Sequence, residues 1–250
     1  MDDITFNRFK KFVSEVSEFN DVFSEIRSID GISFELKEDE TPVTHIDYFI
    51  EKSLRNSIFE EFPSHSIIGE EYEDSLRKSP YKWIIDPIDG TFSLTKGVPL
   101  YGILIGLLSN DTPLYGSVRF PLLQKMICGD GSITFENGKK IECTNNISLK
   151  ESLILTSDEN RVSKSKYNES WQHLNGLVSN HRTWGDCYGY YLVCSGKAQV
   201  MFDLDLKPCD ILPLVPIIKG AGCEIIELTE PYKDIIVCCK NLKNEILKCF

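Results

Sequence analysis

An apolar run that ends in two carboxylates constrains the fold of this chain more than any other feature. The letters WII at positions 83–85 are followed by Asp86, Pro87, Ile88 and Asp89. The apolar run indicates a strand, and since proline cannot extend a hydrogen-bonded ladder, Pro87 should fix a turn at the end of this strand. Both carboxylates should then converge at the end of that strand, where a sheet delivers side chains to its edge.

This pair of carboxylates is typical of a metal site. Hard divalent ions such as Mg²⁺ take oxygen ligands, so Asp86, Asp89 and a backbone carbonyl suit Mg²⁺ better than they suit zinc. Gly90 and Thr91 open an expected helix, whose free N–H groups and positive dipole end favour a phosphate. The same letters also suit an ordinary N-cap and turn, and this segment alone leaves that alternative open.

Three further acidic residues lie at comparable places. Glu70 follows the apolar run 62–68, Asp47 comes three residues after Thr44, and Asp210 directly precedes an apolar stretch. Each alone would also suit a solvated turn or a helix cap. Together with 83–91, four acid-bearing segments lie at strand ends or helix starts. So many caps or turns are a weaker explanation than one shared acidic site, which the four segments therefore predict.

Helices and strands are interleaved along the chain. Apolar spacing predicts a helix over 4–27 and a second one after Asp47, separated by a polar, hairpin-like stretch at 34–47. The second helix should bury Phe49, Ile50, Leu54, Ile58 and Phe59. Further helices are expected at 187–195 and 211–222. Strands are expected at 66–71, 81–91, 100–108, 114–120, 125–129, 132–141 (with a turn at Asn137-Gly138), 152–157, 198–203, 223–228 and 234–239.

This interleaving predicts a layered α/β architecture. We expect one domain over 1–250, with a metal-site half at about 1–145 and a C-terminal half at about 146–250.

Composition narrows the possible partners. The 250 residues hold 27 Lys+Arg against 38 Asp+Glu, a formal charge of -11, which argues against binding nucleic acid or anionic lipid. The longest apolar stretch is far below the roughly 20 residues that span a bilayer, and the first residues do not resemble a leader peptide. Nine Cys without zinc-ligand spacing indicate reduced thiols, so we expect a cytoplasmic protein with no membrane partner.

Several motifs together resemble one known family. The segments Lys37–Asp47 (K-x-x-x-x-P-V-T-x-x-D), 69–71 (GEE) and 83–91 (WIIDPIDGT), with the later Asp210, are similar in order and spacing to the inositol monophosphatase superfamily of Mg²⁺-dependent phosphomonoesterases. The resemblance extends over nearly the whole chain. It implies an alternating αβαβα sandwich, commonly a homodimer, that binds two or three Mg²⁺ ions.

The resemblance also implies roles for individual residues. The metal ligands would be Glu70, Asp86, the Ile88 carbonyl, Asp89 and Asp210. Gly90 and Thr91 would bind phosphate. Thr91, with Glu70 and Asp47, would orient the attacking water, so these three are the expected catalytic residues.

A second segment bears on the substrate. Residues 182–190 (RTWGDCYGY) resemble the histidinol-phosphate phosphatase branch of the superfamily more than its inositol branch. Gly185, Asp186 and Asp203 are the expected substrate-binding residues, because the two carboxylates would offset a cationic ammonium and imidazole. Asp186 could instead be a helix cap. The chain departs from the family at Cys209, where Trp is usual, at Cys223 and at Lys96.

We therefore expect an Mg²⁺-dependent phosphoric monoester hydrolase that converts histidinol phosphate to histidinol and phosphate, a reaction of histidine biosynthesis. Inositol 1-phosphate, a nucleotide 3′-phosphate or a sugar bisphosphate are the alternative substrates. A non-catalytic metal-binding relative is the alternative from another class, and retention of all the acids argues against it. A Ser-His-Asp hydrolase is disfavoured because the chain has no G-x-S-x-G segment.

Overall fold

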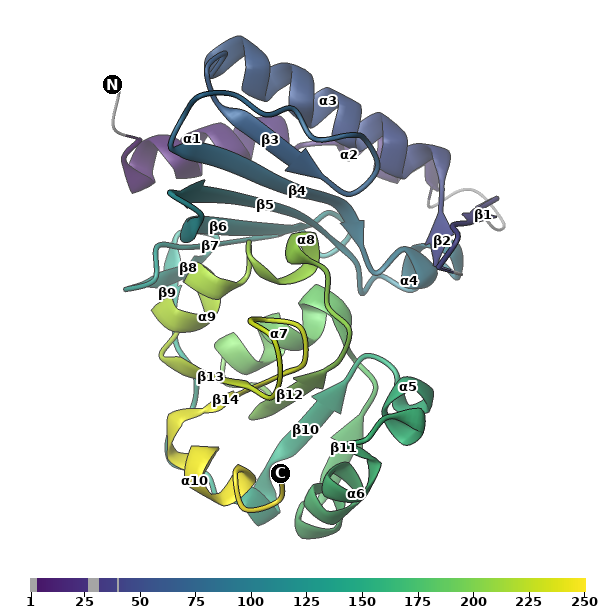
Figure 1. Cartoon of the computed structure of the whole chain (residues 1–250), viewed down its shortest axis with the longest axis vertical. Coiled ribbons are helices and arrows are strands. Elements are labelled where there is room, and N and C mark those ends of the chain that lie inside the picture. Colours follow the sequence, from purple (N-terminus) through teal and green to yellow (C-terminus); the bar gives the residue numbers. More distant parts are fainter. Residues whose placement is uncertain (1–3, 27–31, 40) are drawn as a thin grey trace.

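The computed structural model describes residues 4–26, 32–39 and 41–250. Five layers alternate down the molecule (Figure 1). Helices α1 (Phe6–Val16), α2 (Asn20–Ile26) and α3 (His45–Glu61) cover a first sheet, and α7 (Asp186–Cys194), α8 (Pro208–Ile211) and α9 (Val215–Gly220) separate it from a second sheet. Helices α5 (Glu159–Lys164) and α6 (Asn168–Leu177) lie beyond the second sheet. The predicted α/β layering is confirmed.

The first sheet has seven strands in sequence order. They are β3 (Ser66–Gly69), β4 (Tyr81–Asp89), β5 (Gly102–Ser109), β6 (Thr112–Phe120), β7 (Lys125–Gly129), β8 (Thr134–Glu136) and β9 (Lys139–Ile141). Strand β3 pairs with β4 in parallel, and every later pair is antiparallel. Side chains alternate between the faces of a strand, so Trp83 and Ile85 join the core under α1–α3, while Ile84 packs with Cys209 on the other face.

The second sheet has the strand order β11-β10-β12-β14-β13. Its members are β10 (Leu153–Thr156), β11 (Asn180–Arg182), β12 (Val200–Asp203), β13 (Cys223–Glu227) and β14 (Ile235–Cys239). Two short helical segments, η2 (Lys240–Leu242) and α10 (Lys243–Ile246), follow β14, and η1 (Leu149–Glu151) precedes β10. A small hairpin of β1 (Glu35–Leu36) and β2 (Pro42–Val43) stands apart, as predicted for the polar stretch.

A row of glycines lets the middle layer approach the first sheet. Gly106, Gly116 and Gly129 are register partners across β5, β6 and β7. A Cβ on Gly116 would lie 1.8 Å from the backbone oxygen of Pro213, and one on Gly129 would lie 2.6 Å from Ile217 Cα. The segment that carries Asp210 therefore rests directly on sheet backbone.

Two of the helix predictions are wrong in detail. The helix expected over 4–27 is two helices: α1 ends at Val16, where its C-cap Ser17 donates its hydroxyl to the Val13 carbonyl at 2.6 Å, and α2 starts at Asn20. The helix expected at 211–222 is likewise divided between α8 and α9, where Pro213 has no N–H to continue the first helix. Residue 27, at the end of the first prediction, and Glu40, in the polar stretch, lie outside the described residues.

The prediction that Phe49 is buried in the second helix is also wrong. It is 52% exposed, whereas Ile50, Leu54 and Ile58 are buried as expected. Ile46, one turn before Ile50, belongs to the buried face of α3, and Phe49 does not. Helices α5 and α6 and strand β11 were not predicted, because their segment is polar and shows no clear period.

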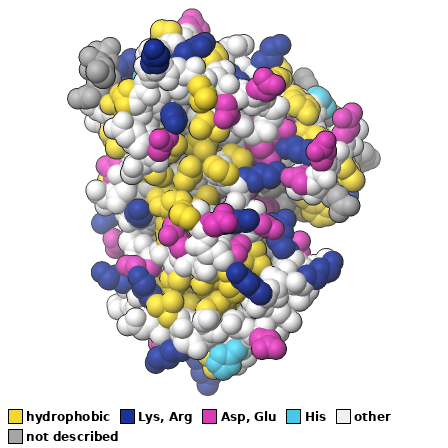
Figure 2. All heavy atoms as spheres, viewed as in Figure 1, with side chains coloured by type: hydrophobic (Ala, Val, Ile, Leu, Met, Phe, Trp, Pro, Cys, Tyr) yellow, Lys and Arg dark blue, Asp and Glu magenta, His cyan; other side chains and the backbone are white. Residues whose placement is uncertain are grey.

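Among the described residues, no helix is both long and apolar enough to cross a bilayer. On the face shown in Figure 2, Lys and Arg side chains are interspersed with Asp and Glu.

Candidate active site

The acidic site begins where β4 ends. Strand β4 continues past the turn expected at Pro87 to Asp89, and its pairing with β5 is irregular between Asp86 and Asp89. The Asp86 side chain is buried, and its Oδ1 accepts the N–H of Ile88 at 3.0 Å. Gly90 follows with a φ of 89°, in the left-handed region that favours glycine, and α4 (Thr91–Thr95) starts directly after it. The turn thus places acids and a helix start side by side.

The structure brings the predicted acids together. Oxygens of Glu70 and Asp86 and the sulfur of Cys209 all lie within 4.8 Å of one another. Burial raises the pKa of Asp86 well above its ordinary value, and the charges of Glu70, Asp89 and Asp210 add to the shift. Burial also raises the pKa of Asp89 and of Asp210. Crowded carboxylates of this kind are stable as anions only beside cations.

Asp47 and Asp210 each act as a helix cap and also belong to this site. Asp47 Oδ2 accepts the Thr44 N–H at 2.9 Å in a capping box, while its Oδ1 accepts the Thr91 hydroxyl at 3.1 Å. Asp210 Oδ2 accepts the Lys207 N–H at 2.8 Å at the start of α8. The cap and the site interpretations therefore do not exclude each other.

Two lysines offset part of the negative charge. Lys37 Nζ lies 2.9 Å from Glu70 Oε1 and 2.6 Å from Glu71 Oε1, and Lys207 Nζ lies 3.5 Å from Glu70. Burial, opposed by the hydrogen bond from Lys37, raises the pKa of Glu71 to about 7. Glu71 and the ion-pairing role of Lys37 were not predicted, although both residues belong to the motifs that we singled out.

A buried ion pair holds the loop that carries Glu70. Glu51 accepts the N–H of Glu71 at 2.7 Å and the Nε–H of Arg55 at 2.7 Å. The Arg55 guanidinium also donates to the Tyr72 carbonyl at 3.0 Å. A Cβ on Gly69 would lie 1.9 Å from Glu51 Oε1, so the loop packs directly on this carboxylate. The sequence holds a signal for Glu51 and Arg55: they repeat Asp47 at intervals of four on one helix face.

Asp186, one of the expected substrate-binding residues, lies beside Gly90, which is expected to bind phosphate. A Cβ on Gly90 would lie 3.1 Å from Asp186 Oδ2, which places the Asp186 carboxylate beside Gly90. Asp186 has a φ of 50°, an uncommon value for a residue other than glycine. The N–H of the next residue, Cys187, donates to Asp89 Oδ2. The start of α7 therefore contacts the end of β4 directly.

Asp203 lies behind this contact. Its Oδ2 accepts the Ser157 hydroxyl at 2.8 Å and lies 3.3 Å from the Tyr190 hydroxyl. Ser157 Oγ in turn accepts the Asp186 N–H at 2.9 Å. A Cβ on Gly185 would lie 2.1 Å from Ser157 Cα, so the loop needs glycine there. This geometry favours a positioning role for Asp203, reached through Ser157, which the sequence did not single out.

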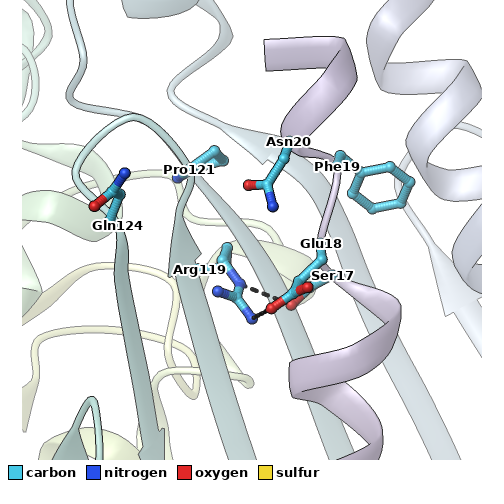
Figure 3. Close-up of a pocket in the computed structure, with 7 residues that line it drawn as sticks. All are labelled: Ser17, Glu18, Phe19, Asn20, Arg119, Pro121 and Gln124. Carbon is cyan, nitrogen blue, oxygen red and sulfur yellow. Dashed lines mark hydrogen bonds and ion pairs between the residues drawn. The ribbon is translucent and has the colours of Figure 1, made fainter. Parts of the chain in front are cut away.

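A pocket lies away from these residues. Figure 3 shows it between the α1–α2 junction and the β6–β7 turn, with the Arg119 guanidinium directed at Ser17 and Glu18. Arg119 Nε donates to Ser17 Oγ at 3.1 Å. None of the predicted site residues lines this pocket.

Fold and site together define a hydrolase that works with metal ions on phosphate esters. The chain belongs to the inositol monophosphatase family, whose model matches residues 12–248. Members of this family are phosphoric monoester hydrolases that act with divalent metal ions, and so is this chain.

Individual relatives show how far the similarity extends. The chain is 36% identical over 190 residues to a histidinol-phosphatase of Chlorobaculum parvum, covering 74% of this chain and 72% of that one. It is 40% identical over 197 residues to inositol monophosphatase 1 of Bos taurus, covering 75% and 71%. A solved IMPase/NADP phosphatase complexed with NADP and Ca²⁺ has the same fold, with a TM-score of 0.86 at 21% identity over 99% of this chain and 97% of that one.

Proposed function

We propose that this chain uses Mg²⁺ to hydrolyse a small phosphate monoester of a cationic alcohol, with histidinol phosphate as the first candidate. The observation that carries the proposal is the Asp186 carboxylate beside Gly90, next to the acidic cluster. A carboxylate in that position suits an ammonium or imidazolium group on the alcohol, because opposite charges attract strongly where water is excluded. The similarity to a histidinol-phosphatase supports the same choice.

The donor set fits Mg²⁺ in character. Glu70, Asp86, the Ile88 carbonyl, Asp89 and Asp210 would hold the ions, and these are oxygen ligands, as hard cations require. The bound ions would polarise the phosphate, activate water and offset the charge of the leaving alkoxide. We propose two or three ions for this site, as the family resemblance implies.

The chain's own residues would handle the water and the ester. The Thr91 hydroxyl lies between Asp47 Oδ1 and the Ile88 carbonyl, so it can orient the attacking water while Asp47 accepts a proton. Phosphate oxygens would bind at the backbone N–H groups of Gly90 and Thr91. Asp186 would hold the cationic part of the alcohol.

Inositol 1-phosphate is the second candidate substrate. The 40% identity to inositol monophosphatase 1 favours it. A polyol carries no positive charge, so it would add no counter-charge to the Asp186 carboxylate.

A substrate panel tests the proposal. Phosphate release should be measured with Mg²⁺ on histidinol phosphate, inositol 1-phosphate, a nucleotide 3′-phosphate and fructose 1,6-bisphosphate. We expect the highest kcat/KM for histidinol phosphate. A clear preference for inositol 1-phosphate would overturn the substrate assignment and leave the phosphatase class intact.

A homodimer, a cytoplasmic location and a place in histidine biosynthesis all stay predictions. Sedimentation of the purified chain would test the first of them.

A further inference from the structure

Cys209 lies beside Glu70 and Asp86 in the acidic cluster, although Mg²⁺ is bound by oxygen ligands and not by sulfur. Its Sγ is within 4.8 Å of an oxygen of Glu70 and of an oxygen of Asp86, and those two oxygens are within 4.8 Å of each other. The residue is only 6% exposed. One side of it packs with Ile84 and the other meets the carboxylates, since Sγ lies 3.4 Å from Asp210 Oδ1.

Sulfur changes which cations such a set of ligands prefers. Mg²⁺ favours oxygen alone, whereas Zn²⁺, Co²⁺ and Cd²⁺ also accept a thiolate. Zinc–sulfur bonds are about 2.3 Å and zinc–carboxylate bonds about 2.0–2.2 Å, so the ligand atoms around one zinc ion lie within about 4 Å of one another. The three ligand atoms lie within 4.8 Å of one another, so a contraction of less than about 1 Å would bring them to that spacing.

We propose that Cys209, together with Glu70 and Asp86, binds a thiophilic divalent cation such as Zn²⁺ in competition with Mg²⁺. The inference rests on the proposed function, because both ions use the same two carboxylates. Binding breaks the S–H bond of Cys209, forms a sulfur–metal bond and releases the proton to solvent. Occupation by the thiophilic ion then excludes Mg²⁺ from Glu70 and Asp86.

Cys187 provides a matched control within the same site. Its side chain is also buried, and its Sγ lies 3.9 Å from the Asp89 carbonyl oxygen. It does not belong to the group of converging ligand atoms that Cys209 completes. A sulfur ligand in this region should therefore come from Cys209 and not from Cys187.

Cobalt titration of the whole chain tests the proposal. Co²⁺ bound by a thiolate absorbs in the near ultraviolet, and Co²⁺ bound by oxygen alone does not. We expect this band in the wild type and in Cys187→Ser, and its loss in Cys209→Ser and Cys209→Ala.

Zinc competition against cobalt should show an affinity for Zn²⁺ about tenfold or more weaker in Cys209→Ser. The Mg²⁺ concentration for half-maximal phosphate release should change much less. Circular dichroism would verify that each variant is folded.

Three results would overturn the proposal: no band in the wild type once calorimetry shows Co²⁺ bound, a band that persists in folded Cys209→Ser, or a band lost only in Cys187→Ser. Phosphate release with Mg²⁺ and no cobalt tests the proposed function separately. Release without a cobalt band would leave the phosphatase and remove only the Cys209 ligand.

Discussion

Thr91 has the geometry of a residue that orients water. Its hydroxyl lies 2.8 Å from the Ile88 carbonyl and 3.1 Å from Asp47 Oδ1. We expect Thr91→Ala to lower kcat about 100-fold with little change in KM, because we propose that the hydroxyl orients the attacking water and not the bound ester. Thr95→Ala is the matched control, since Thr95 in the same helix donates to the Phe92 carbonyl. An unchanged kcat with a raised KM would make Thr91 a substrate-binding residue.

Asp186 should select the charge of the substrate. Asp186→Asn removes a carboxylate that, on the proposed function, would face the cationic alcohol, and this loss would weaken a charge-assisted hydrogen bond by about 1.5–3 kcal/mol. We therefore expect kcat/KM to fall roughly 10- to 100-fold for histidinol phosphate and much less for inositol 1-phosphate. An equal loss on both esters would show that Asp186 only shapes the loop.

Helix α3 carries Asp47, the proposed catalytic residue, and supports the loop of Glu70, a proposed metal ligand. Glu51 holds the loop 69–72 through the Glu71 N–H, while Arg55 holds it through the Tyr72 carbonyl. In the wild type the Glu51 carboxylate accepts hydrogen bonds from Arg55 and from the loop. In Glu51→Gln one of its oxygens becomes an NH₂ group, which is itself a donor and cannot accept these bonds, so the loop and Glu70 should shift. We expect the Mg²⁺ concentration for half-maximal activity to rise about tenfold or more, with a smaller change in kcat.

Glu60→Gln, on an exposed part of the same helix, is the control for that change. If Glu51→Gln lowered only thermal stability and left the Mg²⁺ dependence unchanged, the ion pair would be structural and nothing more.

The same helix shows which contacts a sequence can reveal. Asp47 could be predicted because its cap partner, Thr44, is three residues away and its role follows a local pattern. The spacing of Glu51 from Asp47 places it on the same helix face, but its partners in the loop could not be predicted, because they are 20 and 21 residues further along the chain. Ser157 was missed for a similar reason, since Asp203 is 46 residues away and only the pairing of β10 with β12 brings them together.

At the scale of the whole molecule, the helices that cover the first sheet could be predicted from the sequence, and those that cover the second sheet, α5 and α6, could not. Strands with a strong apolar pattern, such as β4 and β5, are found where expected. Helices α5 and α6 pack few of their residues, Val162, Trp171 and Leu174, into the core. So few buried positions leave no clear period in the sequence.

The stability of the metal-free molecule should depend on pH through Asp203. Burial raises the pKa of this carboxyl to about 7 in the folded chain, although Ser157 donates a hydrogen bond to it, while the unfolded pKa is about 4. The fold thus favours the protonated form, and this stabilisation is complete below about pH 4 and lost as the pH rises to about 7. From this group alone, the free energy of unfolding should fall by up to about 1.4 kcal/mol per pH unit.

Urea unfolding in chelator across that range measures the effect, and Asp203→Asn should flatten the slope. Asp205→Asn is the control, because Asp205 is exposed and its left-handed backbone accepts Asn equally well. An identical slope in Asp203→Asn would show that Asp203 is ionised throughout.

Phosphate release by Asp86→Asn tests the central claim most directly, that metal ions held by the converging carboxylates carry out the hydrolysis. Asp86 is buried at the end of β4, among the charges of Glu70, Asp89 and Asp210. With Mg²⁺ and histidinol phosphate, we expect the wild type to release phosphate and to stop in excess chelator. Folded Asp86→Asn should retain less than about 1% of that rate, since it lacks one charge of the ion's ligand set. Near wild-type release by this variant, or by the wild type in chelator, would contradict the account.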